Sequence, residues 1–440
     1  MKSNARSTVA VVAAIATALL AGAGVTVAST AHATSATISP QTALDWNLIA
    51  VNTVRAATPA KAQIEGNLYM SYTQAAVYDA VTAIKGKYTP YRAVGVSAPG
   101  ASPRAAVAAA AYATLSYYFP SQAATLTTLY TDYLNVTLAM LPAKAKQAGV
   151  AVGTAAAADL IASRWGDGRD APVSTKYGVA PQPVGTWVFA PAPSVQSAQI
   201  PWVSSMRPFM LESAGQFQAP APPPLTSTEY AQAVNEVKTL GSATSTTRTP
   251  AQTAIAQFWN ANVINQIHQV FRDVAKAHGL DLVDTVRLMA MGSMVASDAG
   301  IACMESKYHF LLWRPVTAIR NASLDGNPGT DANATWSPLL TTPNHPEYPS
   351  AHGCVTSAVT EVLKSVLKTD AINVDVPGAT GGGTTLTTSR HFNTADELLK
   401  DVADARIFAG LHYRFATTAG VELGRKVSQW DLQHNFQAAK

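Results

Sequence analysis

The chain has 440 residues, with 31 basic and 27 acidic side chains and a formal net charge of +4. Hydrophobic residues make up 48% of the sequence and charged residues only 13%, which excludes a disordered chain and allows a large core. The sequence shows no basic stripe with interleaved aromatic residues, so the small positive charge is no argument for a nucleic-acid partner.

The first 33 residues have the pattern of a secretory signal peptide. Lys2 and Arg6 form a basic start, residues 9–20 an apolar core, and Ala31-His32-Ala33 a cleavage site of small residues. A membrane anchor is the alternative, but the apolar core is short and no other run is long enough to span a bilayer. We therefore expect a bacterial-type leader to be removed near Ala33, which leaves a soluble, secreted chain without membrane contact.

The segment 34–240 is predicted to be an N-terminal helical half. Helical spacing of Ala, Leu and Val recurs through it, over 42–57, 69–86, 102–118, 122–141, 144–165 and 226–240. Between the last two helices, residues 166–226 are rich in proline. This stretch also carries Trp187, Trp202 and Phe209, which are groups to bury, so we expect an extended wrap over the core rather than a tail.

The segment 250–440 is predicted to be a second helical half, which carries the chemistry. Its helical patterns cover 250–278, 281–314, 351–368, 394–409 and 414–436. Two long loops, 320–348 and 369–393, separate helices, and loops of this length tend to be functional. The second loop holds a triple glycine, but no Lys-Ser/Thr follows it, which favours a flexible loop over a phosphate cradle. No strand pattern persists, so the predicted fold class is all-α, with bundled helices.

The stretch from His345 to Gly353 leads into the helix predicted at 351–368. Ser350, Ala351 and His352 therefore fall at or just inside its first turn. A helix N-terminus offers unpaired N–H groups and a partial positive charge, which favour an anion. The alternative is structural: Ser350 caps the helix, and the histidine beside it is incidental.

Two more pairs of basic residues flank this helix. Lys307 and Arg314 are seven positions apart, or two helical turns, so they are expected to share one helix face before Pro315 ends that helix. Arg406 and His412 are six apart, about 240° around a straight helix. They can converge only if the chain bends, and Gly410 is the expected place. With no paired acids nearby, these residues have the composition of a site for a tetrahedral oxyanion.

Cys303 and Cys354 are the only two cysteines. Each lies next to one of the basic motifs, so the two thiols come close together if the motifs converge on one anion. An exported chain permits a disulfide between them. Two unpaired buried thiols are the alternative, and the sequence does not decide between them.

The three motifs together resemble a known family. Lys307…Arg314-Pro315, Pro349-Ser350-Ala351-His352 and Arg406…His412 match, in order and spacing, the signature of the vanadium-dependent haloperoxidases and the type-2 phosphatidic-acid-phosphatase-like (PAP2-like) acid phosphatases. The resemblance extends to Tyr78-Asp79-Ala80 and Gly185-Thr186-Trp187 and favours the bacterial haloperoxidase-like branch. The family usually has glycine where this chain has Ala351, and alanine keeps the backbone donor only if its φ is negative.

The resemblance implies an enzyme that holds vanadate and uses hydrogen peroxide to oxidise a halide, which then halogenates a small organic substrate. Phosphate would compete for the same site. His412 would be the axial ligand to vanadium, His352 the acid–base residue, and Lys307 would also polarise bound peroxide. His345, at a position where bromide-oxidising relatives carry histidine, weakly favours bromide; a second proton relay and a plain loop residue are the alternatives. The implied oxyanion ligands are Lys307, Arg314, Ser350, the Ala351 N–H and Arg406.

Two other functions remain open at this stage. In a secreted acid phosphatase, His412 would attack phosphorus to form a phosphohistidine and His352 would protonate the leaving alkoxide. A binding protein or an inactive relative is the third reading, and Ala351 is the residue that keeps it open. The length of the chain and its long wrapping loops favour the haloperoxidase. The sequence does not indicate the oligomeric state.

Overall fold

The computed structural model describes residues 37–96, 99–190, 197–381 and 383–439. Contacts group Ile38–Lys440 into one compact unit. The predicted signal peptide, 1–33, lies outside the described residues. The division into halves at 34–240 and 250–440 stays a prediction.

The all-α prediction is confirmed, since the described residues hold thirteen α-helices and one two-stranded hairpin. The helices are α1 (Gln41–Arg55), α2 (Gln63–Lys85), α3 (Pro103–Tyr118), α4 (Ala123–Asp132), α5 (Ala143–Ser163), α6 (Thr228–Leu240), α7 (Pro250–Phe258), α8 (Val263–Ala277), α9 (Leu282–Phe310), α10 (Pro315–Arg320), α11 (Ala351–Leu367), α12 (Ala395–Phe408) and α13 (Arg414–His434). The strands are β1 (Val374–Gly378) and β2 (Thr388–Phe392), paired antiparallel.

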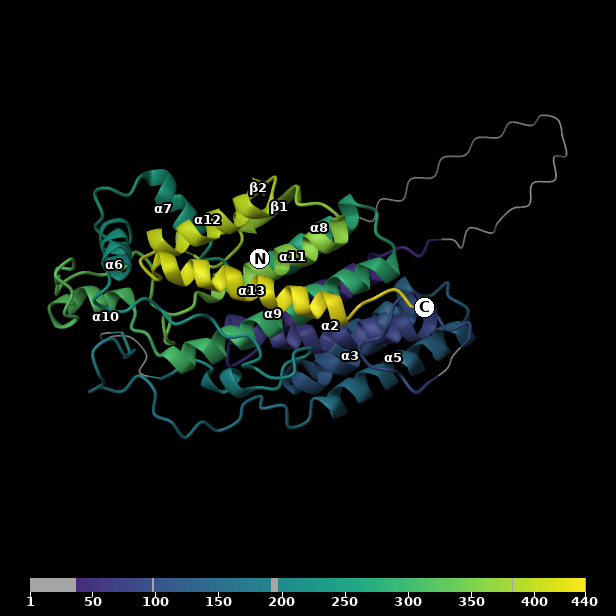
Figure 1. Cartoon of the computed structure of the whole chain (residues 1–440). Helices are drawn as coiled ribbons and strands as arrows, with labels where there is room; N and C mark the ends of the chain where they lie inside the picture. Colours follow the sequence, from purple (N-terminus) through teal and green to yellow (C-terminus); the bar gives the residue numbers. More distant parts are fainter. Residues whose placement is uncertain (1–36, 97–98, 191–196, 382, 440) are drawn as a thin grey trace, which may run out of the picture. The chain divides into compact units, whose positions relative to one another are not determined.

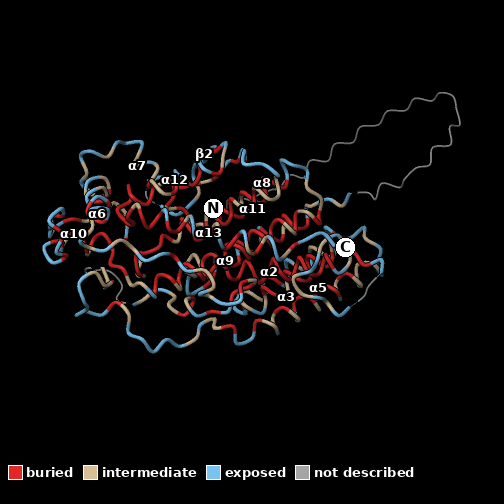
Figure 2. Tube along the Cα trace, in the orientation of Figure 1, coloured by how far each residue is buried: buried red, intermediate tan, exposed pale blue. Residues whose placement is uncertain are grey.

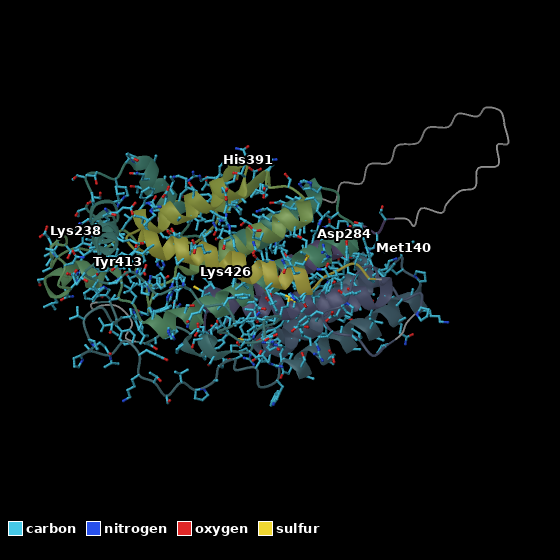
Figure 3. The ribbon with its side chains drawn as sticks, viewed as in Figure 1. Met140, Lys238, Asp284, His391, Tyr413 and Lys426 are labelled. Atoms are coloured by element: carbon cyan, nitrogen blue, oxygen red, sulfur yellow. The ribbon has the colours of Figure 1, made fainter. Side chains whose placement is uncertain are left out.

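Helix α9 is the centre of the packing. It contacts α2 from the first half and α11 and α13 from the second half (Figure 1). Nearly all side chains of α2 and α9 are buried, because each is apolar around most of its circumference, and the buried trace in Figure 2 follows them. In Figure 3, Met140, which is 96% exposed, marks the surface, whereas Tyr413 is fully buried.

Helix α9 also corrects the expectation that no run after the leader is long enough to span a bilayer. Among the described residues, it alone has the length and composition of a membrane span. However, 94% of its apolar window is buried against other parts of the protein. This burial is typical of the core helix of a globular protein.

The helix predicted over 281–314 is shorter than expected. It ends at Phe310, and Leu311 takes a left-handed conformation with φ 51° while its N–H donates to the Lys307 carbonyl. Arg314 then stands at the N-cap of α10. Lys307 and Arg314 therefore do not share one helix face, and the prediction of a continuous helix through both is wrong.

Other boundaries also differ from the prediction. The helix expected over 250–278 is split into α7 and α8, because Asn262 accepts hydrogen bonds from the Ile264 and Asn265 N–H groups and starts a new helix. The loop 369–393 contains the β1–β2 hairpin, which the sequence pattern did not indicate. The break predicted at Gly410 is confirmed, since α12 ends at Phe408 and Gly410 has φ 79°.

The proline-rich segment 166–226 wraps over the core as predicted. Trp187, Trp202 and Phe209 are all buried. The Trp187 N–H donates to the Leu311 carbonyl, and the Trp313 N–H donates to the Gly185 carbonyl. The wrap thereby supports the turn that places Arg314.

Candidate active site

Helix α11 begins at the site, and the side chain of its N-cap residue makes no capping hydrogen bond. Ser350 is its N-cap residue, with φ −72° and ψ 120°, yet its hydroxyl makes no capping hydrogen bond and has no partner among the described residues. The structural alternative, in which Ser350 caps the helix, is therefore wrong. Ala351 is the first helical residue and is absent from the positive-φ positions, so its N–H keeps the direction of a first-turn donor.

Lys307 and Arg314 are completely buried behind the helix start. The Lys307 Nζ donates to the carbonyls of Pro346 and Glu347, at 3.0 and 2.8 Å. The Arg314 guanidinium donates to the carbonyls of His345 and Leu411, at 2.9 and 3.0 Å. Burial lowers the pKa of Lys307 to about 8 and that of Arg314 to about 10. Both cations are thus held by neutral carbonyls, and each is destabilised by its burial.

Arg406 is the least satisfied cation of the site. It lies in the last turn of α12 and is 3% exposed. Its Nε and Nη1 have no hydrogen-bond partner among the described residues. Burial, and then the charge of Arg314, lowers its pKa to about 9. An unpaired buried guanidinium is costly, so this position favours a bound anion.

The bend at Gly410 brings His412 back towards Arg314. The His412 Nε2 lies 3.4 Å from the Arg314 Nη1, and its Nδ1 lies 2.8 Å from the Glu347 Oε1. The ring is 2% exposed. Burial and the charges of Arg314 and Lys307 lower its pKa well below the ordinary value. His412 is therefore a neutral imidazole at neutral pH.

Glu347 contradicts the expectation that no acid lies near these cations. Its side chain is fully buried, and its Oε1 accepts a hydrogen bond from the Tyr413 N–H and lies within hydrogen-bond distance of the His412 Nδ1. Its Oε2 has no partner among the described residues. Burial raises the pKa of Glu347 to about 7, against the opposing effect of Lys307 and Arg314. The sequence analysis missed the role of Glu347 because its partner His412 belongs to another motif, 65 residues away. The only indication in the sequence was an acidic residue within a motif of basic residues.

The other two histidines of the site differ in how they are held. The Nε2 of His352 has no partner among the described residues, and burial and then Arg406 lower the pKa of the ring well below its ordinary value. His345 instead contacts Arg314, with 3.0 Å between its Nδ1 and the guanidinium Nη2. Burial and Arg314 lower the pKa of His345 as well. Both rings are neutral at neutral pH.

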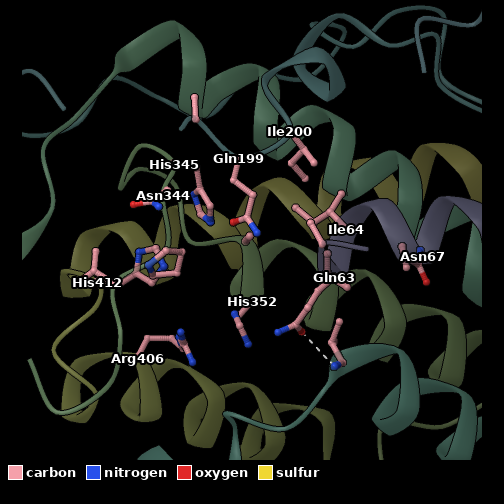
Figure 4. Close-up of a pocket in the computed structure, with 18 of the residues that line it drawn as sticks. Gln63, Ile64, Asn67, Gln199, Ile200, Asn344, His345, His352, Arg406 and His412 are labelled. Atoms are coloured by element: carbon pink, nitrogen blue, oxygen red, sulfur yellow. Dashed lines mark hydrogen bonds between the residues drawn. The ribbon is translucent and has the colours of Figure 1, made fainter. Parts of the chain in front are cut away.

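A cavity of about 540 Å³ opens onto the site (Figure 4). Its wall includes Arg406 and the histidines at 345, 352 and 412. The lining also includes apolar side chains from several elements, together with polar ones such as Gln63, Asn67 and Gln199; the apolar residues are Ile64, Ile200, Val263, Ile267 and Val355. The site is therefore open to small molecules on one side and enclosed by the core on the other.

The unpaired atoms at this place provide a test for a bound group. The Ser350 hydroxyl, the His352 Nε2 and two nitrogens of Arg406 are all buried without partners among the described residues. Each of these atoms donates a hydrogen bond or can do so. They lie in the same site as two further buried cations, Lys307 and Arg314, and the N-terminus of α11. This donor set fits a tetrahedral oxyanion such as vanadate or phosphate. The residues predicted for the oxyanion are thus gathered in one region, apart from the early motif at 78–80, whose Asp79 instead holds the N–H groups of Tyr91 and Arg92.

Comparison with known proteins matches the same part of the chain. Residues 287–439 match the family described as the VCPO second helical-bundle domain. A vanadium chloroperoxidase from Curvularia inaequalis is 27% identical over 256 residues, which cover 44% of this chain and 41% of that protein. Residues 287–439 are thus similar to the second helical bundle of the vanadium chloroperoxidases. Because less than half of the fungal relative is matched, its activity does not transfer to this chain directly.

Solved structures extend the similarity to nearly the whole fold. A bacterial vanadium-dependent iodoperoxidase superposes with a TM-score of 0.74 at 22% identity and covers 92% of this chain and 98% of its own. The holo form of a bacterial vanadium-dependent chloroperoxidase superposes with a TM-score of 0.66 at 17% identity, over 87% of this chain and 93% of its own. At these identities the likeness shows the fold, including the first half that the family match leaves out.

The two cysteines of this haloperoxidase-like chain are free and fully buried. The Cys303 thiol lies 3.7 Å from the Pro349 carbonyl and close enough to Cys354 to share a hydrogen bond with it. The predicted proximity is confirmed. Of the two alternatives, the structure has the pair of buried thiols, and the disulfide is not formed.

Proposed function

We propose that the chain is a vanadate-dependent haloperoxidase, which uses hydrogen peroxide to oxidise a halide. The observation that supports this most is the set of buried, unpaired donors at the start of α11, together with Arg406. The match of residues 287–439 to the VCPO second helical-bundle domain supports the same function. When bound there, vanadate would act as a Lewis acid towards peroxide.

Three cations and a helix start would hold the oxyanion. Arg406 would donate to the oxyanion through its Nε and Nη1, which now lack partners. Arg314 and Lys307 are already fixed by hydrogen bonds to backbone carbonyls, so they would contribute mainly their positive charge. The Ser350 hydroxyl and the Ala351 N–H would donate from the helix start. Because these groups are held by packing before the anion arrives, little rearrangement is needed.

His352 would move the proton. It faces the cavity, and its ring is neutral at neutral pH because burial and Arg406 lower its pKa. A neutral imidazole accepts a proton from hydrogen peroxide and can return it to a leaving water. Lys307 would polarise the bound peroxide, a role that its burial strengthens. His412 would hold the vanadate through its Nε2.

The halide and the organic substrate are the finer parts of the proposal. We propose bromide as the halide, because the resemblance places His345 where bromide-oxidising relatives carry histidine. The related proteins are described as chloro- and iodoperoxidases, which gives no support to bromide in particular. The apolar side of the cavity, with Ile64, Ile267 and Val355, suits a small organic substrate next to the oxidised halide. We also propose that the enzyme is secreted after cleavage near Ala33.

Paired assays on one vanadate-free preparation test the function. One half receives vanadate, bromide, hydrogen peroxide and a phenol-red-type acceptor; the other receives an aryl phosphate and no vanadate. We expect bromination that requires vanadate, is suppressed by phosphate and is lost in His412→Ala. Phosphate release without bromination would instead assign the acid phosphatase chemistry to the same residues, and no activity in either assay would support a binding protein. Replacing bromide by chloride and iodide then tests the bromide preference.

A further inference from the structure

Among the described residues, Glu347 is the acidic side chain that lies within hydrogen-bond distance of the proposed vanadium ligand, His412. Its Oε1 lies 2.8 Å from the His412 Nδ1 and 3.0 Å from the Tyr413 backbone nitrogen. A backbone N–H can only donate, so Oε1 is an acceptor in this arrangement. When Glu347 is ionised it can only accept, so the His412 Nδ1 carries the hydrogen in its contact with Oε1.

The other side of the ring requires the same tautomer independently. The His412 Nε2 lies 3.4 Å from the Arg314 Nη1. A guanidinium nitrogen donates and never accepts, so Nε2 must present its lone pair towards Arg314. An imidazole that carried its hydrogen on Nε2 would have two donors facing each other there and no donor for Glu347.

Glu347 is itself fixed by the backbone on both sides. Its N–H donates to the Leu312 carbonyl at 2.9 Å, and its carbonyl accepts from the Lys307 Nζ at 2.8 Å. Its side chain is 0% exposed. A carboxylate held this rigidly can set the orientation of the ring that it contacts.

We propose that Glu347 is a positioning residue, which locks His412 as the Nδ1–H tautomer and so keeps the Nε2 lone pair available to vanadium. The inference rests on the proposed function only in taking vanadate as the bound group. It also separates vanadate from phosphate. Phosphate at this site needs cations and hydrogen-bond donors, whereas vanadate also needs the Nε2 lone pair.

A pair of variants of similar size separates this role from simple packing. Glu347→Gln keeps an oxygen that can accept from both N–H groups but removes the charge. Glu347→Leu fills similar space and removes the acceptor. Glu305→Ala is a control for the loss of one negative charge, because Glu305 is only partly buried and its carboxylate accepts from the Gln218 side chain.

The first measurement is the tautomer in the vanadate-free protein, read from the ¹⁵N spectrum of labelled histidine. The His412 signal is assigned by its loss in His412→Asn. We expect the Nδ1–H form in the wild type and in Glu347→Gln, and a mixture or the Nε2–H form in Glu347→Leu. An Nε2–H signal in the wild type would overturn the proposal, even if Glu347→Leu failed to fold.

The second measurement compares vanadate and phosphate affinities by calorimetry on each protein. Loss of the acceptor should weaken vanadate binding by about 10–100-fold and leave phosphate binding unchanged or tighter. Equal losses for both anions would indicate a merely structural role and contradict the proposal. Both measurements are made without peroxide or halide, so their outcome is independent of whether the protein halogenates anything.

Discussion

Arg406 is the residue at which function and stability conflict most directly. Its Nε and Nη1 are buried without partners among the described residues, beside the charges of Arg314 and Lys307. Removing such a cation relieves repulsion and desolvation in the unliganded protein. The same change removes the donors that an oxyanion would use.

We therefore predict that Arg406→Leu is more stable than the wild type when no anion is present. The expected gain is about 1–4 kcal/mol in the free energy of unfolding, measured by urea denaturation in phosphate-free buffer. The vanadate affinity should fall by at least about 100-fold, since a charged hydrogen-bonding partner is lost. A variant that is less stable and still binds vanadate would show that Arg406 serves the fold rather than the anion.

Ala351 is a second test at the residue scale, because the sequence left its effect open. Its place as the first residue of α11, without a positive φ, keeps its N–H directed as in any helix start. We predict that Ala351→Gly changes the vanadate affinity by less than about 3-fold, below 1 kcal/mol, as measured by calorimetry. A 10-fold or larger gain in vanadate affinity would mean that the Ala351 methyl group obstructs the site. It would then support the alternative of an inactive relative.

At the scale of elements, the site depends on how closely α11 approaches α13. A Cβ added at Gly420 would lie 2.5 Å from the Ser350 carbonyl oxygen, and one added at Gly424 would lie 2.1 Å from that of Cys354. The two helices therefore meet backbone to backbone, directly behind the residues that face the anion. No side chain fits between them.

Gly420→Ala should consequently disturb both the fold and the site. We predict a loss of about 1–3 kcal/mol in the free energy of unfolding, together with weaker phosphate binding, because Ser350 would be displaced. Gly95→Ala is the control, since nothing lies within 4 Å of its added Cβ. Thermal unfolding and phosphate calorimetry measure the two effects; unchanged binding in a destabilised Gly420→Ala would show that the helix start tolerates the shift.

The elements also show what the sequence could and could not predict. The apolar spacing behind Ser350 predicted α11 correctly, and Gly410 predicted the bend that returns His412 to Arg314, because glycine readily takes a positive φ. The end of α9 was missed because Leu311 takes a left-handed conformation that leucine does not signal. Glu347 was missed for another reason: its role depends on contacts with residues far away in the sequence, and no local pattern encodes them.

At the scale of the whole molecule, buried carboxyl groups make stability depend on pH. Asp79 is 2% exposed within α2, and desolvation raises its pKa from 3.8 to about 7, although the N–H groups of Tyr91 and Arg92 oppose the shift. Because its folded pKa exceeds the unfolded value, the folded state binds more protons between these pH values. Protonated Asp79 therefore adds to the free energy of unfolding. This contribution is complete below about pH 4 and is lost as the pH rises to about 7.

Asp79→Asn should remove this dependence. An amide oxygen can still accept from both backbone N–H groups, so the contact is kept without the buried charge. We predict that the variant exceeds the wild type in stability by up to about 4 kcal/mol at pH 8, since the pKa rises by about three units and one unit corresponds to about 1.4 kcal/mol, and by only about 2 kcal/mol at pH 5. Denaturant titrations at both pH values measure the difference; an equal offset at both would contradict the assignment of this titration to Asp79.

The unpaired donors around Ser350 and Arg406 have a consequence for how the protein is made. Inorganic phosphate is abundant inside every cell and fits the same donors, so the newly folded chain would acquire phosphate first. Its presence would stabilise the fold by mass action while excluding vanadate. If the leader directs export, then the exchange of one anion for the other takes place outside the cell, and activity depends on the ratio of phosphate to vanadate in the surroundings. Recombinant material would accordingly need to be freed of phosphate before any assay of its chemistry.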